Sequence, residues 1–257
     1  MINTYSISVF TVIVFMLFMY AAAQIKKDNS IVDIGWGMGF ILITLSLILS
    51  SGNAAIDAYY FSSMIFIWGI RLTLHIYSRA KGRGEDFRYA EWRKNWGRKA
   101  AWIAFYKVFM LQGLLMLFIA LPVLVYFDKR GDENIILKIS GAVIFIIGFL
   151  FEAVGDMQLS NFKKNPSNKG RIITSGLWRI TRHPNYFGEA VLWWGIALYS
   201  YACTKSVVVF LGPLLLNFLL LKVSGIPLLE KKYEGRSDWE RYKLITPTFT
   251  PWIGKKG

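Results

Sequence analysis

The stretch best suited to chemistry is RHPNYFGE, at residues 182–189, which opens a long apolar run. Pro184 fits the first turn of a helix, where a missing N–H costs nothing, so we expect a helix to begin near His183. The free N–H groups and positive dipole end of that helix favour a bound anion. Asn185 and Glu189, four residues apart, share one helix face and can present an amide and a carboxylate to one ligand. The stretch therefore predicts a polar binding site at the N-terminus of an apolar helix.

A second pair of acids lies upstream. Glu152 and Asp156 repeat the four-residue spacing and are followed by Lys163 and Lys164. A carboxylate facing lipid is costly, so acids in apolar helices normally turn toward a bundle interior or a hydrated cavity. The other ionisable groups within or at the cytoplasmic ends of the apolar runs are Asp33, Arg71, His75, Lys107, His183, Glu189 and Lys222. Together these groups predict one polar chamber that opens to the cytoplasm.

Plainer explanations stay open for some of these residues. Lys107 and Lys222 are as well explained by long side chains that reach back to the membrane surface. His75 is a core histidine about as readily as a proton donor. The basic loops also suit contact with anionic lipid headgroups. The acids are too short to reach the surface, and they carry most of the case for a ligand site.

A third cluster follows the third apolar run, in the sequence SRAKGRGEDFRYAEWRKNWGRK at residues 78–99. Glu85, Asp86, Arg88 and Tyr89 stand behind two glycines, an arrangement that suits a loop folding over a bound nucleotide. An interfacial amphipathic segment anchored by tryptophans explains the same residues equally well. The sequence leaves both interpretations open.

The elements that must position these residues are membrane helices. The 257 residues are 54% hydrophobic with mean hydropathy +0.40, yet they carry a formal net charge of +14 that is confined to connectors. This pattern predicts an all-α, polytopic membrane protein with residues 1–257 as a single domain. Nucleic-acid binding is not expected, because the cations alternate with apolar runs and form no common face. The expected spans are residues 4–24, 34–56, 58–78, 101–127, 135–157, 184–204 and 206–228.

Charge in the connectors predicts the orientation. Residues 79–99 carry eight basic and three acidic groups, a net +5, and residues 157–183 carry six basic groups and no acid, a net +6. The intervening connectors are near neutral. Because basic loops stay in the cytoplasm, we expect seven transmembrane helices with the N-terminus outside and the C-terminus cytoplasmic. On the fifth span, Gly141, Gly148 and Gly155 recur every seven residues and predict a smooth stripe for close helix packing.

Three sequence runs carry a family resemblance: SGLWRITRHPNYFGEAVLWWGIAL, the upstream FEAVGDMQLSNFK and the downstream LLEKKYEGRSDWERYKLITPTFTPW. They resemble the C-terminal half of the steroid 5-alpha-reductase superfamily, and most closely its bacterial integral-membrane branch. The resemblance is close over about residues 150–252 and loose over about residues 31–100. At RHPxY and at the Glu…Tyr…Pro tail the chain is also similar to isoprenylcysteine carboxyl methyltransferase, which uses S-adenosylmethionine.

The reductase resemblance implies seven helices, a cytoplasmic NADPH site and hydride delivery to an activated carbon–carbon double bond. Asp156, Asn185 and Glu189 match cofactor-binding positions of that pattern, and Glu152 stands where the reductases often have asparagine. The resemblance extends the expected NADPH site to Lys163, Arg179, Arg182, His183, Tyr186, Arg241 and Tyr242. For the catalytic acid that polarises the substrate carbonyl, we expect Asp33 with His75 or Tyr77.

The sequence thus favours a membrane-embedded, NADPH-dependent reductase of a lipophilic unsaturated substrate, in a bacterial cytoplasmic membrane and in contact with its lipids. The net +6 of residues 157–183 favours a phosphate-bearing dinucleotide over the near-neutral S-adenosylmethionine. Two alternatives remain: an S-adenosylmethionine-dependent methyltransferase of a lipid or isoprenoid, and a non-enzymatic membrane protein that binds lipid headgroups or solutes.

Overall fold

The computed structural model describes residues 3–52, 54–129, 131 and 133–251, and within these ranges every regular element is helical. The all-α expectation is therefore confirmed. The end of the expected cytoplasmic tail, residues 252–257, lies outside the described residues. The chain forms two compact units, residues 1–132 with 203–209 and residues 133–202 with 210–257. That the whole chain acts as one domain stays a prediction.

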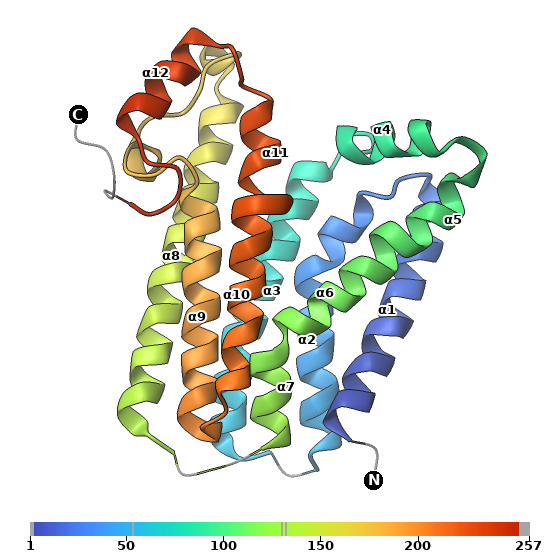
Figure 1. Cartoon of the computed structure of the whole chain (residues 1–257), viewed down its shortest axis with the longest axis vertical. Coiled ribbons are helices and arrows are strands. Elements are labelled where there is room, and N and C mark those ends of the chain that lie inside the picture. The colour runs from blue at the N-terminus through green and yellow to red at the C-terminus, as the bar shows by residue number, and fades with distance from the viewer. Residues whose placement is uncertain (1–2, 53, 130, 132, 252–257) are drawn as a thin grey trace. The chain divides into compact units, whose positions relative to one another are not determined.

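The first unit begins with three long helices, α1 (Thr4–Lys26), α2 (Ile31–Ser50) and α3 (Ile56–Ala80), coloured blue to cyan in Figure 1. The side chain of Asn3 caps α1 by accepting a hydrogen bond from the Ser6 N–H at 2.7 Å. The second helix was expected to continue to residue 56, but it ends at Ser50. The turn that follows contains Gly52 with φ of +72°, a left-handed conformation that stops a helix and favours glycine.

The fourth span was expected as one helix over residues 101–127, and the structure corrects this. A helical run begins earlier, with α4 (Phe87–Trp96), η1 (Gly97–Lys99), α5 (Ala100–Ala104), the π-helical η2 (Phe105–Met110) and α6 (Leu111–Ile119). A separate helix, α7 (Leu121–Asp128), then starts with Pro122 in its first turn. Proline has no N–H to donate to the preceding turn, so α6 ends before it.

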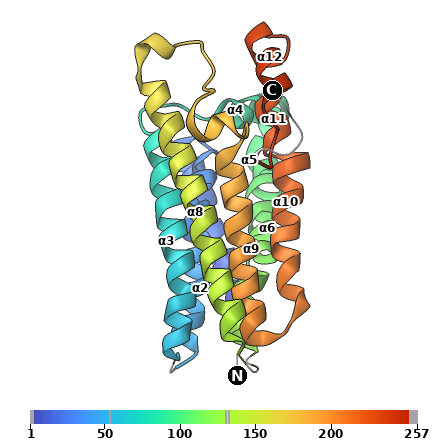
Figure 2. The same ribbon diagram turned by 90° about the vertical axis from the view of Figure 1, so that its left-hand side faces the viewer.

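The second unit contains two long helices, α8 (Ile135–Lys164) and α9 (Pro184–Thr204), which Figure 2 shows side by side. The next helical run starts with η5 (Val207–Phe210), most of which belongs to the first unit. It continues in the second unit as α10 (Leu211–Phe218), the π-helical η6 (Leu219–Val223) and α11 (Ile226–Lys231). Short helical turns η3 (Pro166–Asn168) and η4 (Gly176–Arg179) connect α8 to α9, and α12 (Ser237–Ile245) lies in the tail. The expected start of α9 near His183 is confirmed.

Five helical runs among the described residues are long and apolar enough to cross a membrane: Thr4–Lys26, Ile31–Ser50, Phe87–Ile119, Ile135–Lys164 and Val207–Lys231. The protein is therefore a polytopic membrane protein. The two other expected spans are helices of 25 and 21 residues, α3 and α9, that are less apolar. Arg71 and His75 lower the hydropathy of α3, and several tyrosines and tryptophans with Glu189 lower that of α9.

Candidate active site

The glycine stripe on α8 brings two parts of the site together. A Cβ at Gly148 would lie 2.3 Å from the backbone nitrogen of Leu192 on α9, and one at Gly188 would lie 2.3 Å from the backbone nitrogen of Glu152. The two backbones are thus in direct contact, and the close-packing prediction is confirmed. The α9 half of this contact, at Gly188 and Gly195, was not predicted, although the two glycines repeat the same seven-residue spacing.

This packing places the predicted acids and amide opposite one another. Glu152 and Asp156 on α8 are 2% and 5% exposed, and the Asn185 side-chain amide donates to Asp156 Oδ1 at 3.1 Å. Glu189 is half-buried one turn further along α9. Asp156 and Asn185 therefore meet where α8 and α9 pack, with the buried Glu152 one turn away on α8, and carboxylates and amides of this kind suit a ligand with hydroxyl or positively charged groups.

The segment that enters α9 is held by the tail of the chain. The Arg182 guanidinium donates from Nε and Nη2 to the Glu230 carboxylate at 2.9 and 3.3 Å. It also donates to the carbonyls of Thr246 and Lys243 at 2.9 and 3.5 Å and to the Thr248 hydroxyl at 2.6 Å. A guanidinium has five N–H donors, and these contacts use all five. Arg182, expected to bind phosphate, is instead committed to the protein.

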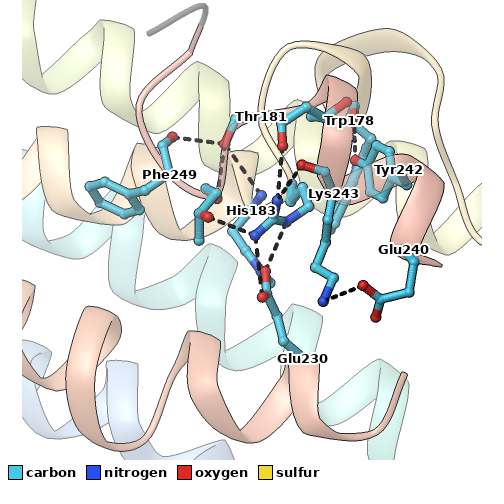
Figure 3. A network of polar contacts seen from close by, with 11 residues as sticks. Trp178, Thr181, His183, Glu230, Glu240, Tyr242, Lys243 and Phe249 are labelled. Carbon is cyan, nitrogen blue, oxygen red and sulfur yellow. Dashed lines mark hydrogen bonds and ion pairs between the residues drawn. The ribbon is translucent and has the colours of Figure 1, made fainter. Parts of the chain in front are cut away.

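Further contacts hold the same tail segment, as Figure 3 shows around Thr181 and Tyr242. The Thr181 hydroxyl donates to the carbonyl of Phe249 at 2.7 Å, and the Arg182 N–H donates to the carbonyl of Pro247 at 2.9 Å. The Tyr242 hydroxyl donates to the carbonyl of Trp178. Burial raises the pKa of Tyr242 well above its ordinary value, so the hydroxyl stays protonated as a donor. The tail and the RHPNY segment therefore form one folded structure.

His183 lies within this network and has a defined hydrogen-bonding state. Its Nε2 is 3.0 Å from Glu230 Oε1, and its ring lies nearly parallel to that of Tyr186, with centroids 5.8 Å apart. Burial lowers the pKa of His183 below its ordinary 6.5, although Glu230 acts in the opposite direction. The imidazole is consequently neutral near pH 7. Because Nε2 faces a carboxylate, Nε2 carries the proton and Nδ1 is left as a hydrogen-bond acceptor.

Three of the other residues expected at the cofactor, Lys163, Arg179 and Arg241, have exposed side chains. Tyr242 is 4% exposed and belongs to the network through its bond to Trp178. Glu230, which bonds both Arg182 and His183, was missed as a site residue. A signal was present in the sequence, because Glu230 is an acid at the end of an apolar run. A cofactor-binding role for each of these residues stays a prediction.

Asp33, the expected catalytic acid, belongs to a separate cluster in the first unit. Its Oδ1 accepts from the Tyr89 hydroxyl at 2.6 Å, and its Oδ2 accepts from Arg88 Nη2 at 3.0 Å. The two expected partners do not supply these bonds. His75 is half-buried on α3, and Tyr77 is 50% exposed. Catalytic roles for Asp33, His75 and Tyr77 stay predictions.

Neighbouring contacts fold the 85–93 segment onto the start of α2. The Glu85 carboxylate accepts from the Asn29 N–H at 2.7 Å and pairs with Arg93 at 2.9 Å. Gln112 donates to the Tyr89 hydroxyl at 3.2 Å. The segment that the sequence assigned either to a nucleotide loop or to a membrane interface is thus a helix, α4, tied to α2 by side-chain bonds.

Comparisons with known proteins add a family and a partial relative. A family model described as "Protein of unknown function (DUF1295)" matches residues 19–246. A protein of Ustilaginoidea virens named "Probable O-methyltransferase ustE" is 39% identical over 75 residues, which cover 28% of this chain and 26% of that protein. No solved structure matches this chain.

Proposed function

This chain belongs to the DUF1295 family, and we propose that it is a membrane-embedded methyltransferase that uses S-adenosylmethionine to methylate a lipophilic acceptor. The partial likeness to an O-methyltransferase carries the proposal. The resemblance to isoprenylcysteine carboxyl methyltransferase at RHPxY and at the Glu…Tyr…Pro tail supports it. In this chain Glu230, Tyr242 and Pro247 of the tail all bond to residues 178–183.

The charges of the site suit this cofactor better than a dinucleotide. S-adenosylmethionine carries a sulfonium and an ammonium group, and buried Glu152 and Asp156 offer carboxylates to such cations. The pyrophosphate of NADPH needs cations, but the buried Arg182 already gives every donor to the protein. Arg182 is one of the six cations of residues 157–183, whose net positive charge made a dinucleotide the first expectation from the sequence, and the other five lie exposed.

The chain's own residues can then be given roles. Asp156 and Asn185 bind the cofactor, with Glu152 and Glu189 lining the same faces of α8 and α9. S-adenosylmethionine, when bound, supplies an electrophilic methyl group. Transfer to a hydroxyl group releases a proton, and His183 Nδ1 is positioned to accept one because Nε2 is held by Glu230. Glu230 then stabilises the imidazolium, as a carboxylate does beside a catalytic histidine.

The proposal includes the full topology expected from the sequence. α3 and α9 cross the membrane with the five more apolar runs, giving seven spans with the N-terminus outside and the tail in the cytoplasm. The basic loops support this orientation. The acceptor reaches the site from the lipid phase of a bacterial cytoplasmic membrane, so it is an isoprenoid, a lipid or another lipophilic alcohol or acid.

Ligand-induced thermal stabilisation of the detergent-purified protein tests the cofactor. At a hundredfold excess over Kd, a ligand adds about 2.7 kcal/mol, which for a chain of this size raises Tm by about 5–10 °C. We expect S-adenosylmethionine to produce this rise and NADPH to produce none. Stabilisation by NADPH alone would restore the reductase prediction, and stabilisation by neither would favour a non-enzymatic protein.

Site variants make the test specific. Asp156→Asn keeps the shape of the side chain but removes the carboxylate, and should abolish most of the Tm rise. Asp238→Asn is the matched control, because it makes the same chemical change on an exposed carboxylate in the tail. Transfer of a labelled methyl group from S-adenosylmethionine into organic-soluble membrane extract then reports the reaction directly. An equal Tm rise in both variants would show that the cofactor binds elsewhere.

A further inference from the structure

A surface groove of about 380 Å³ lies along one helical segment of the first unit, and none of its lining residues is used by the proposed function. Its lining residues are Lys99, Trp102, Ile103, Tyr106 and Lys107. The volume falls within the range of small-molecule binding sites, about 300–1,000 Å³. The segment is part of the Phe87–Ile119 run that is long and apolar enough to cross a membrane.

The lining residues form a single helix face. Their spacing of i, i+3, i+4, i+7 and i+8 places them on one side of the helical segment that runs from the end of η1 through α5 into η2. The opposite side is buried, with Ala104 and Val108 at 0% and 1% exposure. Trp102 and Tyr106 are 70% and 59% exposed, so their rings face outward on a membrane-crossing segment. Exposed tryptophan and tyrosine are typical of the membrane–water interface.

The two lysines at the ends of this face are available to a ligand. Both are exposed, and among the described residues neither ammonium is paired with a carboxylate. Eight residues separate them, about 12 Å along the axis at 1.5 Å per residue. Helical side chains lean toward the N-terminus, so the Lys107 side chain extends back toward Lys99. An ammonium group beside an apolar surface favours an anionic partner, and anionic lipid headgroups attract lysines near the membrane surface.

We propose that this groove is a binding site for one anionic phospholipid. The phosphate lies nearest Lys99, the Lys107 side chain extends toward it along the helix face, and the acyl chain lies along Trp102, Ile103 and Tyr106. The occupant is a membrane lipid, because the surface between the two cations is aromatic and aliphatic and offers a soluble anion no polar contacts. The site is independent of the methyltransferase proposal, since it shares no residue with it.

Native mass spectrometry of the purified protein, titrated with phosphatidylglycerol or phosphatidylcholine, tests the site. We expect one phosphatidylglycerol to bind more tightly than any phosphatidylcholine. In the variant carrying Lys99→Gln and Lys107→Gln this affinity should fall about 25-fold, since each lysine near an anionic headgroup contributes about fivefold. Trp102→Ala should weaken both lipids, because it removes a surface that contacts the acyl chain.

The matched control carries Lys94→Gln and Lys169→Gln, which remove the same charge at exposed positions outside the groove. An equal loss in this control would mean diffuse attraction to the basic surface and would overturn the proposal, as would equal binding of both lipids by the unaltered protein. Displacement of the lipid by millimolar inorganic phosphate would point to a soluble anion instead. If the double variant elutes as an aggregate, Lys107→Gln alone should show about a fivefold loss.

Discussion

Replacing Gly148 by alanine is predicted to force α8 and α9 apart. The added Cβ would meet the Leu192 backbone nitrogen at 2.3 Å and the Gly188 carbonyl oxygen at 2.6 Å. Both obstacles are backbone atoms, so no side-chain rotation relieves them. Overpacking of this kind costs about 1–3 kcal/mol, and alanine returns about 1 kcal/mol through its higher helix propensity. We therefore expect a net loss of up to about 2 kcal/mol, or roughly 4–8 °C in Tm.

The same helix supplies an internal control. A Cβ at Gly141 would lie 2.7 Å from the Tyr199 backbone nitrogen, whereas one at Gly155 would lie 3.2 Å from its nearest neighbours, Asn185 nitrogen and Pro184 Cγ. Thermal unfolding followed by tryptophan fluorescence should rank the variants Gly148→Ala, Gly141→Ala, Gly155→Ala from least to most stable. For Gly155→Ala the gain in helix propensity offsets the mild contact, so we expect a Tm close to that of the unaltered chain.

The consequence for the site separates this explanation from general destabilisation. If the helices part near Gly148, the 3.1 Å bond between Asn185 and Asp156 lengthens, and S-adenosylmethionine should bind more weakly to Gly148→Ala even well below its Tm. Gly148→Ala melting at or above the unaltered chain, or Gly155→Ala melting lowest of the three, would refute the α8–α9 contact.

Two further predictions concern ion pairs. Glu230→Gln keeps the side-chain shape but leaves the buried Arg182 without a counter-charge, so we expect a loss of about 3–5 kcal/mol in unfolding free energy by denaturant titration; an unchanged midpoint would mean that the pair is not buried. At Glu85, burial acts to raise the pKa, but the Arg93 hydrogen bonds, the Asn29 N–H and the Arg93 charge together hold it below its ordinary 4.5. The folded-state pKa is thus below the unfolded one, so the stabilisation is present above about pH 4.5 and is lost as pH falls through the folded pKa. The Tm difference between the unaltered chain and Glu85→Gln should shrink as pH is lowered from 6 to 3, and a difference independent of pH would exclude this carboxylate as its source.

Features set by neighbouring residues in the chain, such as a helix start or a helix packing face, were predicted correctly from the sequence. Pro184 predicted the start of α9, and the seven-residue glycine spacing predicted the packing face of α8. Two helix boundaries were missed although the sequence contained the signals. The Ser-Ser-Gly turn ends α2 at Ser50, and Pro122 divides the fourth expected span. In both places the expected span was drawn from the length of the apolar run, and the short turn signal inside it was not used.

The site was only partly predictable, because its bonds join residues far apart in the chain. Asp156 and Asn185 were identified from charge and spacing, and they meet because α8 and α9 pack in register. The partner of Arg182 lies 48 residues downstream at Glu230, and the partner of Asp33 lies 56 residues downstream at Tyr89. From sequence alone, an arginine in a basic loop is expected to bind a ligand phosphate, because its carboxylate partner within the protein is distant in the chain. For this reason Arg182 was assigned to phosphate.

The contacts of Arg182 also set the order in which the protein can be completed. Its acid partner and its last donor contact, at Thr248, are made 48 and 66 residues after it. At about 5–20 residues per second of synthesis, the ribosome needs roughly 3–13 seconds to supply them. In every nascent chain the segment that enters α9 is therefore synthesised before these contacts can form, and a premature stop codon at or before Thr248 would remove at least the last of them permanently.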